Sequence, residues 1–298
     1  MRIEWLEDIL AVAETGSFTE AASRRHLTQS AFSRRIKAIE DSLRVELFDR
    51  SRKPVHLRPA IAEHKDRIAA LVVAVRQLAG ELRRGDREGA DRVVIASQHS
   101  LTVSLSPSLV ARLGRDGHNI HVRLRSANLD QCFALLLSGQ ADIALAYRLP
   151  EEEHPINADY IETAVIGTDR LIPIVSTGRA VDVRSRIAQG ELDYVAYPED
   201  VFLGQVMNRT ILTQVANLDQ IVVRAETALT LAAVEMASVG VAVAWVPESL
   251  ARDRLRRKDV SDLCDILPSR SLDITAVRLR ESSGAVVRLV WGCLMAWL

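Results

Sequence analysis

The first sixty residues show short apolar runs at helical spacing, separated by turn signals. A first helix is predicted up to Gly16, a residue type that commonly follows a helix end. Ser17 can cap a second helix over 18–25, and Thr28 can cap a third over 29–43. Their apolar faces comprise Ile3, Leu6, Ile9, Leu10, Ala13, Ala21, Ala22, Phe32, Ile36 and Ile39. Two short helices joined by a tight turn, the second longer and basic, are typical of a helix-turn-helix.

Residues 59–84 carry apolar residues at coiled-coil spacing. One series repeats every seven residues and consists of Ile61, Ile68, Val75 and Leu82. A second series lies three residues after the first three members of the first and consists of His64, Leu71 and Leu78. This seam predicts a long linker helix that pairs with a second copy of the chain. A helix packed on its own domain is the alternative. Gly85, Gly89 and the charged run over 83–92 predict a hinge, so we assign 59–91 to the linker and hinge.

Beyond residue 91, strand-like apolar runs alternate with helical patterns. The predicted strands are 92–96, 120–125, 142–146, 171–175, 194–196, 221–223 and 240–246, and the predicted helices are 101–113, 129–138, 204–215 and 228–238. This alternation favours an α/β fold with a largely parallel sheet covered by helices. The length suits two lobes with a cleft between them, lobe I over about 92–163 and 267–298 and lobe II over about 164–266.

Charge is distributed unevenly along the chain. The 298 residues have a formal net charge of −1, yet residues 17–60 hold ten Lys and Arg against five Asp and Glu. A local excess of positive charge predicts a polyanionic partner for this segment alone. Because the same segment carries the helix-turn-helix pattern, double-stranded DNA is the expected partner.

Membrane, metal and catalytic chemistry are not predicted. No run reaches about 18 uninterrupted apolar residues, and the acidic start MRIEWLEDIL is unlike a secretory signal, so a cytoplasmic protein is expected. Cys132, Cys264 and Cys293 have neither metal-type spacing nor a reason to form a structural disulfide. His118 and His121 would point to opposite faces of a strand. No phosphate loop, nucleophile elbow or HExxH motif is present, so we expect no catalytic residue, metal or cofactor.

Two segments resemble the LysR-type transcriptional regulators. They are FTEAASRRHLTQSAFSRRIKAIEDSLRVELFDRSRKPVHLRPA, residues 18–60, and ETALTLAAVEMASVGVAVAWVP, residues 226–247. The resemblance spans nearly the whole chain. It implies a winged helix-turn-helix at 1–58, a long dimerisation linker helix, and a two-lobed effector domain at 92–298 that is similar to periplasmic solute-binding proteins. It also implies homodimers or homotetramers on DNA and control by a small-molecule effector, with RNA polymerase as a candidate partner.

Three positions depart from the family pattern, which commonly has proline at Ser30 and glycine at Arg44 and Ile61. Proline is tolerated but not required in a first helical turn, whereas Arg44 replaces a glycine that favours a left-handed helix end. The phrases HSLTVSLSPSLV and GQVMNRTILTQ resemble more particularly the hypochlorite-responsive branch. The four methionines do not match that branch's sensing positions, and the cysteines form no close pair like that of the peroxide-sensing branch. Neither mechanism is therefore carried over.

The amino-terminal end of the third helix is predicted to enter the major groove of DNA. Gln29, Ser30 and Ser33 are candidates for base-edge contacts, and Arg34 can contact guanine or phosphate. Arg35 and Lys37 of the same helix are expected to contact phosphates or to lie in solvent. The wing cations Arg50, Arg52 and Lys53 suit the minor groove or the DNA backbone. The predicted DNA-binding residues are Thr28, Gln29, Ser30, Ser33, Arg34, Arg35, Lys37, Arg50, Arg52 and Lys53.

Strand-to-helix turns supply the candidates for effector contacts. In an open α/β sheet, ligands bind where the carboxyl end of a strand meets the amino end of the next helix. Free N–H groups at such a turn can hold an anion, so an anionic effector is favoured. The predicted residues follow strands or begin helices: Ser97, His99, Ser100, Leu101, Thr102, Ser126, Phe202, Gly204 and Thr227.

Three classes of function are compatible with parts of this pattern. A ligand-responsive transcription factor explains the basic amino-terminal block, the heptad helix and the two lobes together. A solute-binding module explains only the residues after about 92, and an α/β enzyme lacks a catalytic constellation that can be named. Oxidant sensing through Cys or Met is a variant of the first class.

Overall fold

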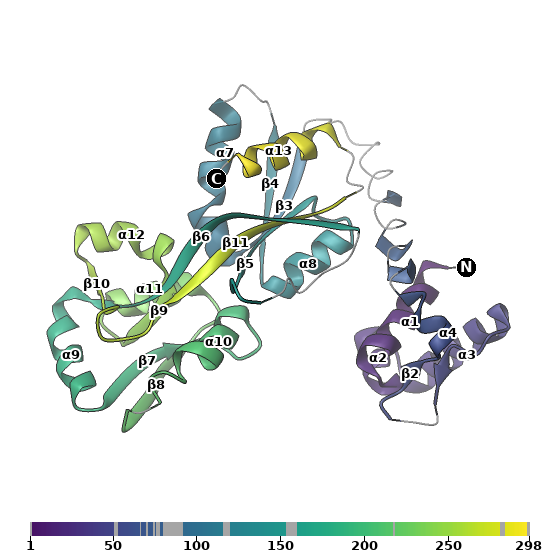
Figure 1. Cartoon of the computed structure of the whole chain (residues 1–298), viewed down its shortest axis with the longest axis horizontal. Coiled ribbons are helices and arrows are strands. Elements are labelled where there is room, and N and C mark those ends of the chain that lie inside the picture. The colour runs from purple at the N-terminus through teal and green to yellow at the C-terminus, as the bar shows by residue number, and fades with distance from the viewer. Residues whose placement is uncertain are drawn as a thin grey trace. The chain divides into compact units, whose positions relative to one another are not determined.

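The computed structural model describes residues 2–50, 53–65, 67–69, 71–73, 75, 78–79, 92–115, 120–152, 160–216, 218–280 and 284–296. These residues belong to two compact units, Met1–Glu88 and Gly89–Leu298 (Figure 1). Each unit has its own hydrophobic core. The predicted hinge glycines, Gly85 and Gly89, lie outside the described residues.

The first unit is a helix-turn-helix with a two-stranded wing. Its helices are α1 (Ile3–Thr15), α2 (Phe18–Arg24), α3 (Gln29–Leu43) and α4 (Pro59–Ala62), and its antiparallel strands are β1 (Phe48–Asp49) and β2 (His56–Leu57). Both predicted helix caps are confirmed. The Ser17 side chain accepts a hydrogen bond from the backbone N–H of Glu20 at 3.4 Å, and the Thr28 side chain accepts one from Ala31 at 3.3 Å.

The apolar stripe of α3 forms the centre of the first core. Phe32, Ile36 and Ile39 are fully buried, and their spacing of four and three residues places them on one face of the helix. They pack in a cluster with Ile9 and Val12 of α1. The opposite face of α3 is therefore turned to solvent.

Asp8 of α1 is a charged residue buried in this unit. Its carboxylate has no exposed surface and accepts hydrogen bonds from Arg25 Nε at 2.9 Å and from Arg35 Nη2 at 2.6 Å. Arg25 also pairs with Glu7 at 2.6 Å. Burial alone would lower the pKa of Arg25, but the hydrogen bond to Asp8 and the charge of Glu7 raise it above its ordinary value. The Asp8 carboxylate therefore links α1 to the end of α2 and to α3.

Gly16 ends α1 and allows the wing to approach it closely. Its φ of +63° lies in the left-handed region, and a Cβ atom there would lie 2.7 Å from the Cβ of Pro54. The Gly16 carbonyl accepts a hydrogen bond from the N–H of Val55 at 2.8 Å. Because both the conformation and the contact require glycine, this residue positions the base of the wing.

The linker is helical at its described positions but is interrupted near its start. α4 ends at Ala62, a turn follows at Glu63 and His64, and residues 65, 67–69, 71–73, 75 and 78–79 are helical. The His64 N–H bonds to the carbonyl of Ile61, three residues back, at 3.0 Å. This tighter 3₁₀-type bond breaks the pattern of an α-helix, so the prediction of one uninterrupted helix from residue 59 was wrong at this point.

The predicted seam divides into an inner and an outer part. Ile61 and Ile68 pack against the core of the first unit. Leu71, Val75 and Leu78 are 44%, 45% and 55% exposed. The last predicted seam residue, at position 82, lies outside the described residues. The exposed apolar residues are thus confined to the later part of the seam.

Arg44 follows α3 in a left-handed conformation, with φ 56° and ψ 34°. We expect Arg44→Gly to stabilise the first unit by about 1 kcal/mol, because glycine adopts this conformation without the clash that a Cβ causes. Thermal unfolding of the full chain, with Arg44→Ala as the matched control, tests this. Alanine removes the charge and keeps the Cβ, so an equal gain in the alanine variant would contradict the explanation.

Nine strands in the described part of the second unit form one sheet in the order β4-β3-β5-β11-β6-β9-β7-β8, with β10 beside β6. The strands are β3 (Arg92–Gln98), β4 (His121–Ala127), β5 (Ile143–Arg148), β6 (Ile161–Ser176), β7 (Glu191–Ala196), β8 (Gln220–Glu226), β9 (Val243–Pro247), β10 (Val260–Asp262) and β11 (Arg270–Leu279). The helices are α6 (His99–Ser104), α7 (Ser106–Arg115), α8 (Leu129–Leu137), η1 (Thr177–Arg179), α9 (Ala180–Ala188), α10 (Phe202–Val206), the π-helical η2 (Met207–Ile211), α11 (Thr230–Ser238), α12 (Glu248–Arg257) and α13 (Ala285–Met295).

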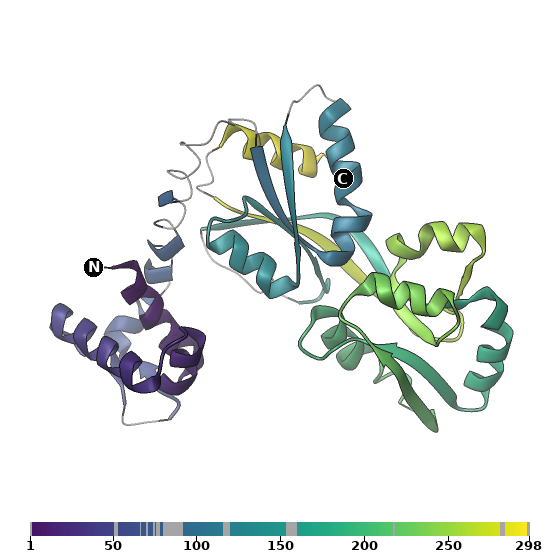
Figure 2. The same ribbon diagram turned by 180° about the vertical axis from the view of Figure 1, so that it is seen from behind.

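The sheet passes through two lobes. In lobe I, β3 is parallel to β4 and β5, and in lobe II, β7 is parallel to β8 and β9. The long strands β6 and β11 run antiparallel to each other and connect the lobes (Figures 1 and 2). β11 also pairs antiparallel with β5, and β6 with β9 and β10. The prediction of a largely parallel sheet was therefore wrong, because these two connecting strands make its centre antiparallel.

Two predicted helices are divided in the structure. The helix expected at 101–113 is α6 followed by α7, which begins at Ser106 with Pro107 in its first turn. Proline lacks the N–H that would continue the preceding helix, so a new helix begins there. The helix expected at 204–215 is α10 followed by η2. The other two predicted helices are present as α8 and α11.

Candidate nucleic-acid interface and ligand pocket

The outer face of α3 presents most of the residues predicted to contact DNA. Gln29, Ser30 and Arg34 are exposed beside the capping residue Thr28, and Ser33 is half-buried. Lys37 extends the same face by one helical turn and is exposed as well. This arrangement follows from the buried stripe on the opposite side of α3.

Arg35 is positioned differently from its prediction. It was expected on a phosphate or in solvent, but its guanidinium pairs with the buried Asp8 and its side chain is 34% exposed. Because a buried carboxylate requires a cationic partner, Arg35 fixes α3 against α1. No local pattern predicts this pair, since the two residues are 27 positions apart.

The wing cations are also partly engaged within the protein. The Arg50 guanidinium pairs with Glu40 of α3 at 2.5 Å and lies 5.1 Å from the centre of the Phe18 ring. Lys53 is exposed, and Arg52 lies outside the described residues. Arg50 therefore attaches the wing to α3, and Lys53 is the wing cation that the structure shows turned to solvent.

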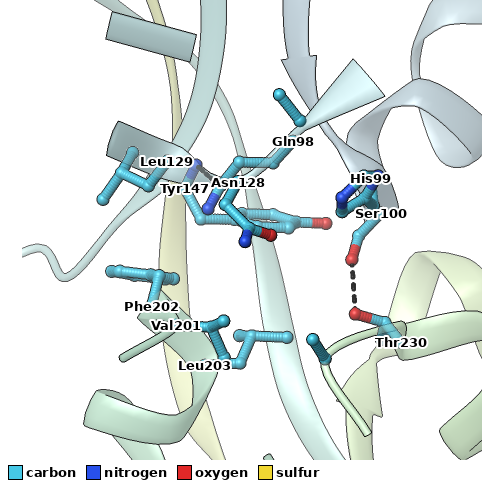
Figure 3. A pocket seen from close by; sticks show the side chains of 12 residues that line it. Gln98, His99, Ser100, Asn128, Leu129, Tyr147, Val201, Phe202, Leu203 and Thr230 are labelled. Atoms are coloured by element: carbon cyan, nitrogen blue, oxygen red, sulfur yellow. Dashed lines mark hydrogen bonds between the residues drawn. The ribbon is translucent and has the colours of Figure 1, made fainter. Parts of the chain in front are cut away.

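A pocket lies where strand ends from both lobes face each other. In lobe I it is lined at the carboxyl ends of β3, β4 and β5, and in lobe II at the turns that follow β7 and β8. Its cavity volume is about 30 Å³, within about 370 Å³ of space that includes open solvent, and it is lined by Gln98, His99, Ser100, Ala127, Asn128, Leu129, Tyr147, Val201, Phe202, Leu203, Ala228 and Thr230. Figure 3 shows the lobe I side chains Gln98, Asn128 and Tyr147 across the space from Val201 and Leu203 of lobe II.

Hydrogen bonds fix the polar part of this pocket. The Ser100 hydroxyl donates to the Thr230 hydroxyl at 2.9 Å and thus links α6 of lobe I to α11 of lobe II (Figure 3). The N–H of Tyr147 donates to Gln98 Oε1 at 2.6 Å. The Tyr147 hydroxyl donates to the buried Asp169 at 2.8 Å. Burial and the negative charge of Asp169 raise the pKa of Tyr147 well above its ordinary value, so this phenol stays protonated.

Three of the predicted effector residues line the pocket: His99, Ser100 and Phe202. Two others lie beside it, because the Ser126 hydroxyl is 2.7 Å from His99 Nδ1 and accepts from Thr102 at 3.1 Å. Ser126 thus contacts the imidazole directly, and Thr102 fixes Ser126.

The remaining four predicted residues do not line the pocket. Ser97 and Leu101 are fully buried. Thr227 accepts a hydrogen bond from the N–H of the second residue after it at 3.1 Å. A Cβ on Gly204 would lie 1.9 Å from the carbonyl oxygen of Pro198, so this glycine allows α10 to pack against the preceding turn.

Sequence reasoning missed several lining residues, among them Gln98, Asn128, Tyr147 and Thr230. Gln98 is the last residue of β3, and Asn128 immediately follows β4. The rule that ligands bind at the carboxyl edge of parallel strands could have found both, had the strand ends been placed two residues later. Tyr147 and Thr230 approach each other only through the arrangement of the lobes.

Redox and metal chemistry find little support in the described residues. Cys132 is fully buried, and burial raises the pKa of its thiol to about 12, so the reactive thiolate is disfavoured. No cluster of three or more His, Cys, Asp or Glu side chains suited to a metal ion occurs in this part of the chain. No described helix is both long and apolar enough to cross a membrane.

Comparisons with known proteins match both units of the chain. Residues 3–60 match the family described as bacterial regulatory helix-turn-helix protein, lysR family, and residues 86–298 match the LysR substrate binding domain. The HTH-type transcriptional regulator YjiE of Escherichia coli K12 is 26% identical over 253 residues, which cover 85% of this chain and 80% of that protein.

Solved structures resemble the chain over nearly its whole length. VV2_1132, a LysR family transcriptional regulator, has a TM-score of 0.63 and 26% identity, with 99% of this chain and 98% of that chain covered. HypT of Salmonella typhimurium, a hypochlorite-specific LysR-type transcriptional regulator, has a TM-score of 0.60 and 24% identity, with 99% and 97% covered. At that identity HypT shares the fold, and membership of the hypochlorite-responsive branch stays a prediction.

Proposed function

Because this chain belongs to the LysR family of bacterial transcriptional regulators, we propose that it selects its DNA sites through the outer face of α3. The chain is a regulator and not an enzyme, with a DNA-binding helix-turn-helix and an effector-binding domain. We assign DNA binding to 1–58, the linker and hinge to 59–91, and effector binding to 92–298. Lobe I comprises about 92–163 and 267–298, and lobe II about 164–266. The protein is expected to act in the cytoplasm, where the DNA is.

The observation that carries the DNA assignment is the exposed edge of α3 beside its capped amino terminus. Gln29 and Ser33 lie one helical turn apart on this edge, and Gln29 is exposed. A glutamine amide can bond two atoms of adenine in the major groove. Arg34, Lys37 and Lys53 form no ion pair with another described residue, and they suit guanine or phosphate contacts. Arg35 and Arg50 support the site from within the protein.

A double substitution, Gln29→Ala with Ser33→Ala, tests this assignment in a genome-wide DNA pull-down with the purified full chain. We expect the wild type to enrich a few promoter sites and the variant to lose them. The affinity for an enriched site should fall by about 1–3 kcal/mol, because one bidentate base contact and one hydroxyl contact are removed. The dependence of affinity on salt should change little, since neither side chain neutralises a phosphate.

The matched control is Gln189→Ala with Ser185→Ala, which removes the same residue types from exposed positions at the end of α9. This control should enrich the same promoters as the wild type. Equal loss in both double variants would contradict the assignment to α3. Enrichment of no site by the wild type would contradict sequence-specific binding itself.

The exposed part of the linker seam supports self-association. Leu71, Val75 and Leu78 repeat at intervals of four and three residues and are each more than two-fifths exposed, which is the pattern of a helix that pairs with another helix. We propose a homodimer through this seam, with a homotetramer on DNA as the larger assembly. RNA polymerase is the candidate partner through which such an assembly would act on transcription.

The pocket between the lobes is the proposed effector site. Its walls come from both lobes, so a bound molecule would contact both at once and favour one arrangement of the lobes over others. The Ser100–Thr230 hydrogen bond is the direct polar contact across this site. An anionic effector is favoured by the amino termini of the two nine-residue helices that border the pocket, α8 and α11.

A further inference from the structure

Polar groups line the interlobe pocket mostly from lobe I, and apolar side chains line it mostly from lobe II. Hydroxyl, amide and imidazole groups come from Gln98, His99, Ser100, Asn128 and Thr230. The lobe II side chains across from them are mainly apolar and include Val201, Phe202 and Leu203 (Figure 3). None of the described residues that line the pocket is Asp, Glu, Lys or Arg. The occupant therefore needs a polar end and an apolar body.

Gln98 shows which kind of polar end is required. Its side chain is 8% exposed, and the N–H of Tyr147 fixes its Oε1 as the acceptor at 2.6 Å. The Nε2 atom must then be the donor, and it has no hydrogen-bond partner among the described residues. Arg148 Nε and Arg270 Nε are the described side-chain atoms that are sealed from solvent without a partner, so Gln98 Nε2 is open to the pocket and can donate to a molecule there.

Two further features of the pocket favour an acceptor of negative charge. α8 begins at Leu129 and α11 at Thr230, both helices have nine residues, and no side chain caps either amino terminus. The side chain of Asn128 makes no hydrogen bond within the described chain and borders the same space. Free N–H groups and the positive ends of helix dipoles stabilise an anion without requiring a lysine or arginine.

The same lining disfavours other charges. An α-ammonium group needs a carboxylate or several acceptors, and no described lining residue is acidic. A second anionic group would lie against the apolar lobe II wall without a cation to pair with it, which is costly in a partly dehydrated site. The cavity volume is only about 30 Å³, well below that of ordinary ligand pockets, so the body must be small.

We propose that the effector is a small monocarboxylate with an uncharged apolar body, and that Gln98 Nε2 donates a hydrogen bond to its carboxylate. The apolar body packs against Val201, Phe202 and Leu203, and the carboxylate lies between Gln98 and the amino termini of α8 and α11. This inference rests on the proposed effector role of the pocket. It excludes free amino acids, dicarboxylates and uncharged alcohols as effectors.

Calorimetric titration of the full chain with matched compounds tests this inference. The panel contains butanoate, 3-methylbutanoate, 4-methylpentanoate and benzoate. 3-Methylbutanoate is compared with valine and 3-methylbutan-1-ol, and 4-methylpentanoate with leucine and 4-methylpentan-1-ol, because each set shares a carbon skeleton. We expect at least one monocarboxylate to bind, and its amino acid and alcohol to bind at least tenfold more weakly. Comparable binding of the alcohol, the amino acid or inorganic phosphate would overturn the proposal, as would failure of every monocarboxylate.

Variants of Gln98 identify the donor. Gln98→Leu should weaken binding of the monocarboxylate by about tenfold to a hundredfold, the range for one hydrogen bond to a charged group. Gln98→Glu should weaken it further, because it places a like charge where the amide donor was. Val181→Ser, which alters an 81% exposed side chain of α9, is the control and should bind as the wild type does. Unchanged binding in both Gln98 variants would overturn the assignment of the donor.

The promoter pull-down separates this inference from the regulator function on which it rests. If the wild type enriches promoter sites but binds no monocarboxylate, the effector class is wrong and the DNA function stands. If a monocarboxylate binds through Gln98 but no promoter is enriched, the pocket chemistry stands and the proposed DNA recognition fails. Circular dichroism of each Gln98 variant should match the wild type, which ensures that lost binding is not lost folding.

Discussion

Asp8→Ala is expected to destabilise the DNA-binding unit by about 3–5 kcal/mol, the usual effect of removing one partner from a buried ion pair. The Asp8 carboxylate is fully buried and is hydrogen-bonded to Arg25 and Arg35. Its removal leaves two guanidinium groups next to a cavity without the anion that they share. Since the stability of a small domain is about 5–15 kcal/mol, such a loss would leave α3 poorly held against α1 and abolish most DNA binding.

Hydrogen exchange of the full chain shows which of the two units loses stability. Amides of α1, α2 and α3 should exchange much faster in Asp8→Ala, while those of the nine-stranded sheet keep their protection. The matched control is Asp41→Ala, which removes the same side chain from an exposed position on α3 and should change stability by less than about 0.5 kcal/mol. Similar exchange in both variants would show that the buried carboxylate does not hold the motif together.

Gly204→Ala is the second substitution with a large expected effect. An added Cβ would lie 1.9 Å from the carbonyl oxygen of Pro198 and 3.0 Å from that of Tyr197. These are backbone atoms, so the overlap can be relieved only by moving α10 away from the turn after β7. We expect a loss of more than about 3 kcal/mol in the stability of the second unit, at the upper end for overpacked sites. Phe202 and Leu203 of the pocket wall would move with the helix.

Gly292→Ala provides the control for this substitution. Gly292 lies within α13, and a Cβ there meets nothing within 4 Å. Alanine has the higher helix propensity, so this variant should be more stable by roughly 1 kcal/mol. Chemical unfolding of both variants, followed by far-ultraviolet circular dichroism, gives the two changes. If both substitutions shift the unfolding midpoint in the same direction, close packing at Gly204 is not the cause.

Local signals in the sequence predicted much of the first unit. Ser17 and Thr28 cap helices as expected, because a cap depends on residues three positions apart. The buried stripe of α3 followed from helical periodicity. Arg35 could not be placed in the same way, since its partner Asp8 is remote in sequence and an arginine on a basic helix is equally suited to phosphate. Arg44 was identified correctly as an unfavourable helix end.

The second unit was predicted less completely for a related reason. Strands that follow one another through a helix produce the alternation that the sequence shows, and these were found. β11 was missed, because its pairs with β5 and β6 join segments about a hundred residues or more apart. Of the predicted effector residues, His99, Ser100 and Phe202 reach the pocket. Tyr147 and Thr230 were not identified, because their proximity depends on how the lobes fold toward each other.

The course of β6 and β11 makes lobe II a single insertion in lobe I. The chain leaves lobe I along β6 and returns along β11, and the two strands are in register side by side, with Asp169 opposite Leu272 and Arg170 opposite Ser271. All of α9 to β10 lies between these two crossings. An exchange of this cassette with a relative would therefore need only two junctions on neighbouring strands and one preserved register. A hybrid sensor in which a relative supplies the lobe II wall of the pocket can be built on this chain in that way.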